Sequence, residues 1–225
     1  MRMRVRELRT PLGPGRAHLQ RPDSSVAQGT GRGTVLLGHG AGAGVESRDL
    51  QALTELSATG WTVALLEQPW HVAGRRVASP PATLDVATRS MLAHLEVGRW
   101  ALPRPWVLGG RSAGARVACR LAVEAQAAAV VALAFPLVPP GRTGRPGGPG
   151  PSRAAELCEP VRHGIPLLVV QGTRDRFGGP HQVHAALGEC VGGPVKVCAV
   201  AGDHSPTRDG AALLQAVCAF LDALP

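Results

Sequence analysis

The sequence predicts a doubly wound α/β fold, and three observations support this prediction. Short, uncharged apolar runs that consist mainly of Val, Leu and Ala recur along the chain. Helix-compatible stretches separate most of these runs, so strand and helix candidates alternate. Turns rich in Gly and Pro follow several of the runs. Continuous apolar strands that alternate with helices are typical of a mostly parallel sheet covered on both faces.

The chain opens with a predicted hairpin. Residues 3–7 and 17–20 are strand candidates, and residues 11–15 between them contain the Gly and Pro that favour a tight turn.

The first unit of strand, loop and helix follows a polar stretch. Residues 34–37 are a strand candidate, residues 39–44 are a glycine-rich loop, and residues 47–58 are compatible with a helix that has Ser47 as its N-cap. The same unit recurs along the rest of the chain. The later strand candidates are residues 61–66, 106–108, 129–135, 167–171 and 195–200. The later helix candidates are a stretch that ends at Gly98 and residues 115–127, 180–189 and 208–223.

One domain is expected over residues 1–225, because a chain of this length can bury one sizeable core. Gly and Pro dominate residues 139–152, which cannot form a core and are expected to be a flexible loop. The next strand candidate follows within about 15 residues, which leaves no room for a folded cap domain.

The net charge of +8 could indicate a nucleic-acid partner, but the distribution of charge argues against one. Lys196 is the single lysine among 24 basic residues, and the arginines are scattered without a run of five or more like charges. Aromatic residues make up 3% of the chain, so few side chains could stack on bases. The arginine content is typical of a GC-rich coding bias, and no nucleic-acid binding is expected.

The five cysteines have no metal-ligand spacing, and we expect reduced, packed thiols. The basic N-terminus lacks the apolar segment of a secretory signal, and the longest apolar stretch, residues 125–140, is too short to span a bilayer. We therefore expect a cytoplasmic protein without a membrane partner. The oligomeric state cannot be predicted from these features.

A Gly-x-Ser-x-Gly motif occupies residues 110–114 and makes Ser112 a candidate nucleophile. Such a serine lies on a sharp turn between a buried strand and a helix, where the two backbones approach closely and small flanking residues are needed. The apolar run that ends at Leu108 and the Ala-rich stretch after Gly114 supply both neighbours. The alternative is a glycine-rich turn with an incidental serine.

A serine hydroxyl needs a base within hydrogen-bond reach and a third group that fixes the tautomer of that base. On a sheet with this turn, the order along the chain is serine, acid, histidine. Asp175 follows the 167–171 strand and His204 follows the 195–200 strand, so both are expected at the sheet edge where Ser112 lies. Alternatively, His204 bonds only its neighbour Asp203, and Asp175 pairs with Arg174 or Arg176. Asp203 and Asp209 are weaker candidates for the acid because of their order in the chain.

Backbone N–H groups are candidates for an oxyanion hole. Ala113 follows Ser112, and Ala41 lies in the glycine-rich 39–44 segment between a strand and a helix, so these two residues are the expected donors. A dinucleotide site is the competing interpretation of that segment, but Gly38, Gly40, Gly42 and Gly44 alternate and do not match Gly-x-Gly-x-x-Gly.

No metal or organic cofactor is expected. His181 and His184 are one helical turn apart, but no third ligand lies nearby in the sequence, so a solvated helix face is the preferred interpretation. Arg111, Arg174 and Arg176 flank the candidate site and could attract an anion, although loop anchoring is favoured.

The Gly-Gly-Arg-Ser-Ala-Gly-Ala-Arg string at residues 109–116, with His39-Gly-Ala-Gly and Asp203-His-Ser205, resembles a branch of the α/β-hydrolases. This branch is related to dienelactone hydrolases and includes a testis-expressed hydrolase-like protein and a subunit of the NSL histone acetyltransferase complex. The resemblance covers about residues 15–225. It implies the α/β-hydrolase fold with about eight strands and a Ser112, Asp175 and His204 triad. It also favours a fold-supporting role over a substrate-binding role for Arg111 and Arg116.

Together these features predict a serine hydrolase that acts on a small ester or related carbonyl compound through an acyl-enzyme. Some relatives resemble scaffolds that have lost catalysis, so the alternative is a non-catalytic module that binds a partner protein.

Overall fold

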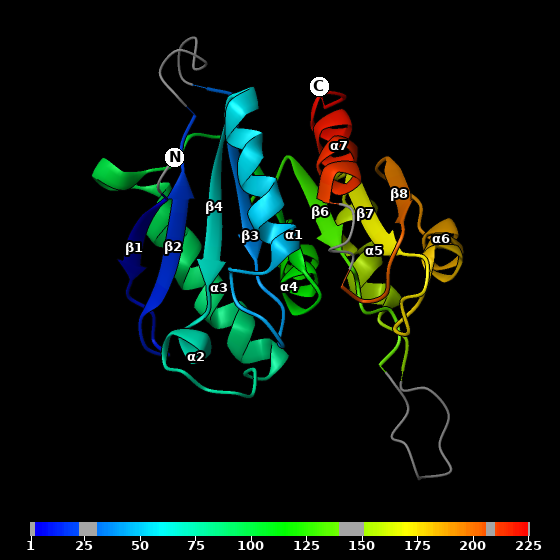
Figure 1. Cartoon of the computed structure of the whole chain (residues 1–225), viewed down its shortest axis with the longest axis horizontal. Helices are drawn as coiled ribbons and strands as arrows, with labels where there is room; N and C mark the ends of the chain where they lie inside the picture. Colours follow the sequence, from blue (N-terminus) through cyan, green and yellow to red (C-terminus); the bar gives the residue numbers. More distant parts are fainter. Residues whose placement is uncertain (1–2, 23–30, 140–150, 206–209, 225) are drawn as a thin grey trace.

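The computed structural model describes residues 3–22, 31–139, 151–205 and 210–224. An eight-stranded sheet runs through the molecule, and helices cover both of its faces (Figure 1). The doubly wound α/β fold predicted from the sequence is confirmed. Within the described ranges no separate cap domain is present. The predicted loop at residues 139–152 lies mostly outside the described residues.

The strand order in the sheet is β1-β2-β4-β3-β5-β6-β7-β8. The strands are β1 (Arg4–Leu8), β2 (Gly15–Gln20), β3 (Gly33–Gly38), β4 (Trp61–Glu67), β5 (Trp106–Arg111), β6 (Ala129–Leu133), β7 (Leu167–Gly172) and β8 (Val195–Val200). Strands β3 to β8 are parallel, whereas β2 pairs antiparallel with both β1 and β4. The predicted N-terminal hairpin is thus confirmed, and it extends the parallel sheet at one edge.

The helices are α1 (Arg48–Ala52), α2 (Pro69–Val72), α3 (Pro81–Glu96), α4 (Ala113–Leu121), α5 (Ala154–Arg162), α6 (Pro180–Gly188) and α7 (Gly210–Leu221). Two 3₁₀ segments, η1 (Leu53–Thr59) and η2 (Gly98–Trp100), complete the described elements. None of the helices in the described ranges has the length and apolar character needed to cross a membrane.

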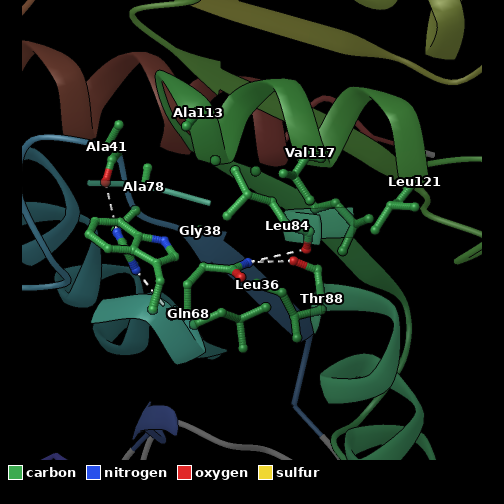
Figure 2. A pocket seen from close by; sticks show the side chains of 18 residues that line it. Leu36, Gly38, Ala41, Gln68, Ala78, Leu84, Thr88, Ala113, Val117 and Leu121 are labelled. Atoms are coloured by element: carbon green, nitrogen blue, oxygen red, sulfur yellow. Dashed lines mark hydrogen bonds between the residues drawn. The ribbon is translucent and has the colours of Figure 1, made fainter. Parts of the chain in front are cut away.

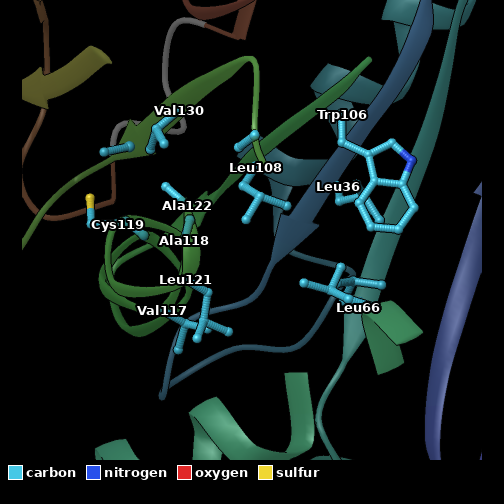
Figure 3. Close-up of a cluster of buried hydrophobic side chains, with 14 of the residues drawn as sticks. Leu36, Leu66, Trp106, Leu108, Val117, Ala118, Cys119, Leu121, Ala122 and Val130 are labelled. Atoms are coloured by element: carbon cyan, nitrogen blue, oxygen red, sulfur yellow. The ribbon is translucent and has the colours of Figure 1, made fainter. Parts of the chain in front are cut away.

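Alternate side chains of the strands supply two separate cores. Leu36 and Leu108 face a core that is closed by α3, α4, α5 and α6, and Figure 3 shows part of it around Trp106. Val35 and Val107 face the opposite core, which is closed by α1, η1 and α7. Because both faces are buried, the central strands lack the polar alternation of a half-exposed sheet.

The structure differs from the sequence predictions in several details. The predicted 47–58 helix divides into α1 and η1, and the Ser47 hydroxyl makes no capping hydrogen bond. Strand β5 extends to Arg111, three residues beyond the predicted end at Leu108. Helix α5 was not predicted, because its nine residues include Pro160 and follow the Gly/Pro-rich segment.

The expectation that all five cysteines are reduced is wrong for one pair. Cys158 of α5 and Cys190, just after α6, form a disulfide with 5.8 Å between their Cα atoms. The pairing depends on α5, the helix that the sequence did not predict, so the approach of the two residues could not be foreseen. Cys119, Cys198 and Cys218 are free thiols.

Candidate active site

Ser112 lies alone between the end of β5 and the start of α4. Its backbone has φ 52° and ψ −106°, a strained combination for a residue with a side chain. The turn depends on small neighbours, since a Cβ on Gly110 or on Gly114 would overlap the backbone of Gly38 in β3. The sharp strand-to-helix turn predicted from the Gly-x-Ser-x-Gly motif is therefore present.

The structure brings Ser112, His204 and Asp175 together. The Nε2 atom of His204 lies 2.9 Å from the Ser112 hydroxyl oxygen, and its Nδ1 atom lies 2.8 Å from Oδ2 of Asp175. Asp175 follows β7 and His204 follows β8, so all three side chains meet at the carboxyl edge of the sheet. Because a carboxylate only accepts hydrogen bonds, the proton of the neutral ring lies on Nδ1, and Nε2 is left to accept from Ser112.

The Asp175 carboxylate is buried and fixed by two further donors. The Gln171 amide Nε2 donates to Oδ2 at 2.9 Å, and the Phe177 N–H donates to Oδ1 at 2.8 Å. Gln171 is itself held by the carbonyls of Phe135 and Gly178. This network aims one carboxylate oxygen at His204, and the sequence analysis did not find it, because glutamine in a buried strand has no distinctive motif.

Arg111 is hydrogen-bonded to the loop that carries His204. Its Nη2 donates to the His204 carbonyl at 3.1 Å and to the Ser205 hydroxyl at 2.7 Å. Its Nε forms an ion pair at 2.9 Å with Asp49, whose side chain is fully buried. Both charges of this pair are therefore already engaged, which fits a fold-supporting role rather than anion binding.

The other arginines near the candidate site have partners different from those of Arg111. Arg116 donates from Nε and Nη2 to the two carboxylate oxygens of Glu156 in α5. Arg174 is exposed, and the guanidinium of Arg176 lies 5.1 Å from the centre of the Phe177 ring. Phe177 in turn lies 4.2 Å from the His204 ring, centre to centre, and shields one side of it.

The alternatives to the predicted acid are not adopted. Asp203 accepts the Ser205 N–H at 2.8 Å, whereas the ring of His204 is bonded to Asp175. Asp209 lies outside the described residues.

His181 and His184, the candidate metal ligands, are both exposed on α6. In the described part of the chain, no group of three or more His, Cys, Asp or Glu side chains is arranged to hold a metal ion.

The two expected oxyanion donors flank the serine. Ala113 is the first residue of α4, so its N–H has no acceptor within the helix. The loop that contains Ala41 passes beside Ser112, since a Cβ on Gly40 would lie 3.6 Å from the Ser112 Cβ. The arrangement agrees with the predicted placement of Ala41 and Ala113, and their role as donors remains a proposal.

His39 holds the loop in place and was not recognised as a site residue from the sequence. Its Nδ1 donates to the Gly40 carbonyl at 2.8 Å, so Nε2 accepts the Gln68 N–H at 3.0 Å. Burial lowers the pKa of His39 and so favours this neutral form. Beside it, Glu67 accepts from His18 and His71; burial disfavours its charge, but these bonds outweigh burial and lower its pKa.

An apolar pocket opens next to the expected oxyanion hole, between α4, α3 and β3 (Figure 2). It starts beside Ala41 and Ala113 and continues to Leu121 at the end of α4. The sequence predicted the serine turn but not this pocket, because the residues that line it come from several segments that are far apart in the sequence.

Comparison with family models gives one match, to a model described as an alpha/beta hydrolase domain, over residues 31–214. The chain belongs to the alpha/beta hydrolase family. A search of curated proteins finds no match. The order serine, acid, histidine along this alpha/beta hydrolase is the order that the fold requires.

Solved structures of similar fold span the whole of this alpha/beta hydrolase. An alpha-beta serine hydrolase homologue from Coxiella burnetii has a TM-score of 0.74 at 16% identity, covering 100% of this chain and 99% of its own. XC6422 from Xanthomonas campestris, described as an a/b serine hydrolase without lid, has a TM-score of 0.68 at 18% identity, with 100% and 98% coverage. Est1E from Butyrivibrio proteoclasticus has a TM-score of 0.74 at 12% identity, with 96% and 97% coverage. At these identities the likeness concerns the fold.

Proposed function

We propose that this chain is a serine hydrolase that cleaves a small carboxylic ester or related carbonyl compound. One observation carries the proposal: the His204 ring lies 2.9 Å from the Ser112 hydroxyl and 2.8 Å from the Asp175 carboxylate at the same time. A histidine held in this way can take a proton from the serine, because its second nitrogen is committed to the carboxylate. Family membership and the fold are consistent with this chemistry.

In the first step, Ser112 Oγ attacks the carbonyl carbon of the ester, and its proton passes to Nε2 of His204. Asp175 stabilises the imidazolium that forms, without taking up the proton itself. The carbonyl oxygen becomes negatively charged in the tetrahedral intermediate. The N–H groups of Ala41 and Ala113 would donate to that oxygen, and such donors act most strongly where charge develops in the transition state.

In the second step, His204 gives its proton to the departing alkoxide, and the acyl group stays on Ser112. Water then attacks the acyl-enzyme with His204 as base, which releases the acid and restores the serine. These steps need proton transfer and charge stabilisation, so the proposal includes no metal or organic cofactor. Its partner is a small-molecule substrate, neither a nucleic acid nor a membrane, and its expected location is the cytoplasm.

Within the family, we place the chain in the branch related to dienelactone hydrolases. The Gly-Gly-Arg-Ser-Ala-Gly-Ala-Arg string supports this placement. Arg111 and Arg116 have structural partners in Asp49 and Glu156, which gives a physical reason for two arginines in the motif.

A fluorophosphonate probe tests the function, because it labels only an activated serine. We expect rapid labelling of the wild type and none of Ser112→Ala, with a matched Ser90→Ala variant labelled like the wild type. Ser90 lies on α3 and bonds a backbone carbonyl, away from the site. A folded wild type that takes up no probe would contradict the proposal and favour the non-catalytic module.

A further inference from the structure

The oxyanion loop, residues 39–44, would present the N–H of Ala41 to the substrate. Ala41 is itself exposed, so its place depends on how the two ends of the loop are held. At the start of the loop, both ring nitrogens of His39 are engaged in hydrogen bonds. At the other end, Gly44 is buried and lies against the ring of His71.

His71 contacts both ends of the oxyanion loop. A Cβ on Gly44 would overlap the Cε1 and Nε2 atoms of the His71 ring, so the backbone of the loop passes directly beside this edge of the ring. The centre of the His71 ring also lies 5.0 Å from the centre of the His39 ring and 5.4 Å from that of Trp70. A change in the place of His71 would therefore reach the loop at Gly44 and at His39.

Glu67 fixes the orientation of the His71 ring. Its Oε1 atom lies 2.7 Å from Nδ1 of His71, which is four residues later in the chain and belongs to α2. Figure 1 shows α2 at the carboxyl ends of β3 and β4, where the oxyanion loop begins. Burial opposes the charge of Glu67, but hydrogen bonds from His18 and His71 outweigh it and lower the pKa of the carboxyl, so an ionised acceptor faces Nδ1 near neutral pH.

Glu67 and His71 repeat the relation between Asp175 and His204. In each pair a buried carboxylate accepts from Nδ1 and so sets the tautomer and the direction of the ring. In the second pair the Nε2 edge of the ring faces the backbone of Gly44. A ring held in this way can position a segment of backbone without contacting a substrate.

We propose, building on the proposed hydrolase function, that His71, held by Glu67, is a positioning residue that fixes the oxyanion loop and with it the N–H of Ala41. This N–H would donate to an oxygen that becomes charged only in the transition state, so His71 acts on the chemical step rather than on substrate binding. Loss of the held ring lets the end of the loop move, and a displacement of about 1 Å in a catalytic group can cost about a hundredfold in rate.

His18 provides a matched control for His71. Its Nε2 lies 2.9 Å from Oε2 of Glu67, the other oxygen of the same carboxylate. His18 belongs to β2, and in the sheet β4 lies between β2 and β3, the strand that the oxyanion loop follows. His18→Phe and His71→Phe therefore each remove one hydrogen bond from Glu67, and only His71→Phe alters the contact with the loop.

Steady-state kinetics on p-nitrophenyl acetate test the proposal. We expect kcat of His71→Phe to fall about ten- to hundredfold while KM stays within about twofold, the pattern of an interaction made only in the transition state. His18→Phe should keep the wild-type kcat. A trifluoromethyl ketone, whose adduct with Ser112 carries the oxyanion, should bind His71→Phe more weakly by the factor lost in kcat. Equal kcat values in the two folded variants would overturn the proposal.

Hydrogen exchange separates this proposal from the proposed function, because it requires no activity. Amides of residues 39–46 should exchange faster in His71→Phe than in the wild type or in His18→Phe. If the wild type hydrolyses no ester but this difference is present, His71 fixes the loop and the hydrolase proposal fails. If esters are hydrolysed while exchange and kcat are the same in both variants, the hydrolase proposal stands and the positioning role of His71 fails.

Discussion

His204 illustrates how much of the proposed chemistry depends on the groups around one ring. Asp175 accepts from Nδ1, and Gln171 and Phe177 hold the carboxylate so that one oxygen faces the ring. The ring is therefore fixed in the tautomer that leaves Nε2 free to accept the serine proton. In the proposed mechanism, the position and tautomer of the ring are set before a substrate arrives, which would lower the free energy of reaching the transition state.

Replacing Asp175 by Asn tests this point. The Asn side chain has nearly the same size, but its NH₂ group would meet either the Nδ1–H of His204 or the donors Gln171 and Phe177. The ring would favour the other tautomer, and we expect kcat on p-nitrophenyl acetate to fall by roughly 10³–10⁴ while folding is kept. Steady-state kinetics together with a melting curve would measure both. A loss of less than tenfold would exclude an orienting role for Asp175.

His39 makes a second prediction, about stability and pH. Burial lowers its pKa from the ordinary value of 6.5, so the folded protein binds this proton less tightly than the unfolded chain. The contribution is fully present above pH 6.5 and is lost as the pH falls towards the folded-state pKa, at up to about 1.4 kcal/mol per pH unit. Urea unfolding between pH 7.5 and about 5 should show this slope.

The matched variant is His39→Gln, which cannot titrate and retains an acceptor. Its free energy of unfolding should depend less on pH over the same interval. Hydrogen bonds to His and Arg partners lower the pKa values of the Glu67, Glu124 and Glu156 carboxyls from their ordinary value, so these groups do not confuse the comparison. An unchanged slope in the variant would show that His39 is not the titrating group.

Several elements converge on the serine turn. β5 and α4 fix the backbone of Ser112, and Arg111 at the end of β5 connects α1 with the loop that carries His204. The Arg111–Asp49 pair is buried, so either charge without the other would remain desolvated and unpaired. Arg111 thus links the serine turn to the loop that carries His204, and Asp49 neutralises the buried charge of this arginine.

Arg111→Met should therefore lower the free energy of unfolding by about 3–5 kcal/mol, because it leaves Asp49 buried and unpaired. Arg111→Met combined with Asp49→Leu removes both charges and should recover most of that loss. Urea unfolding of the two variants measures the difference. If the double variant is no more stable than the single one, the loss does not come from the unpaired Asp49 charge.

The link between α5 and the end of α6 leads to a chemical prediction. With the Cys158–Cys190 disulfide formed, denatured protein kept from reduction should titrate three thiols, from Cys119, Cys198 and Cys218. Reduction before the titration should raise the count to five. A count of five without reduction would show that the two helices are joined only by packing.

Across the whole molecule, sequence patterns predicted the features that are determined by residues close together in the chain, namely most strands and the serine turn. The apolar runs indicated the parallel strands, and the small residues around Ser112 indicated the turn, because strand and turn geometry are imposed locally. The order serine, acid, histidine, together with the predicted strands, also placed Asp175 and His204 at the edge of the sheet where the structure has them. These residues could be predicted because parallel strands place their carboxyl ends together.

Contacts between distant segments could not be predicted in this way. The Arg111–Asp49 pair joins residues from different elements, as do Gln68 with Thr88 and Cys158 with Cys190. Arginine, glutamine and cysteine at these positions are each compatible with many partners until helix packing is known. The helix α5 was missed for a related reason, since its helical state depends on packing against α4 more than on its own short sequence.

The central claim is that Ser112 becomes acylated with His204 as its base. Wild-type protein mixed briefly with p-nitrophenyl acetate, quenched in acid and analysed by peptide mass spectrometry tests it most directly. We predict an acetyl group on the peptide that contains Ser112, formed at least a thousandfold more slowly in His204→Ala, in line with the loss of a triad base. An acetyl group on any other residue, or equal acylation rates in the two proteins, would contradict the account.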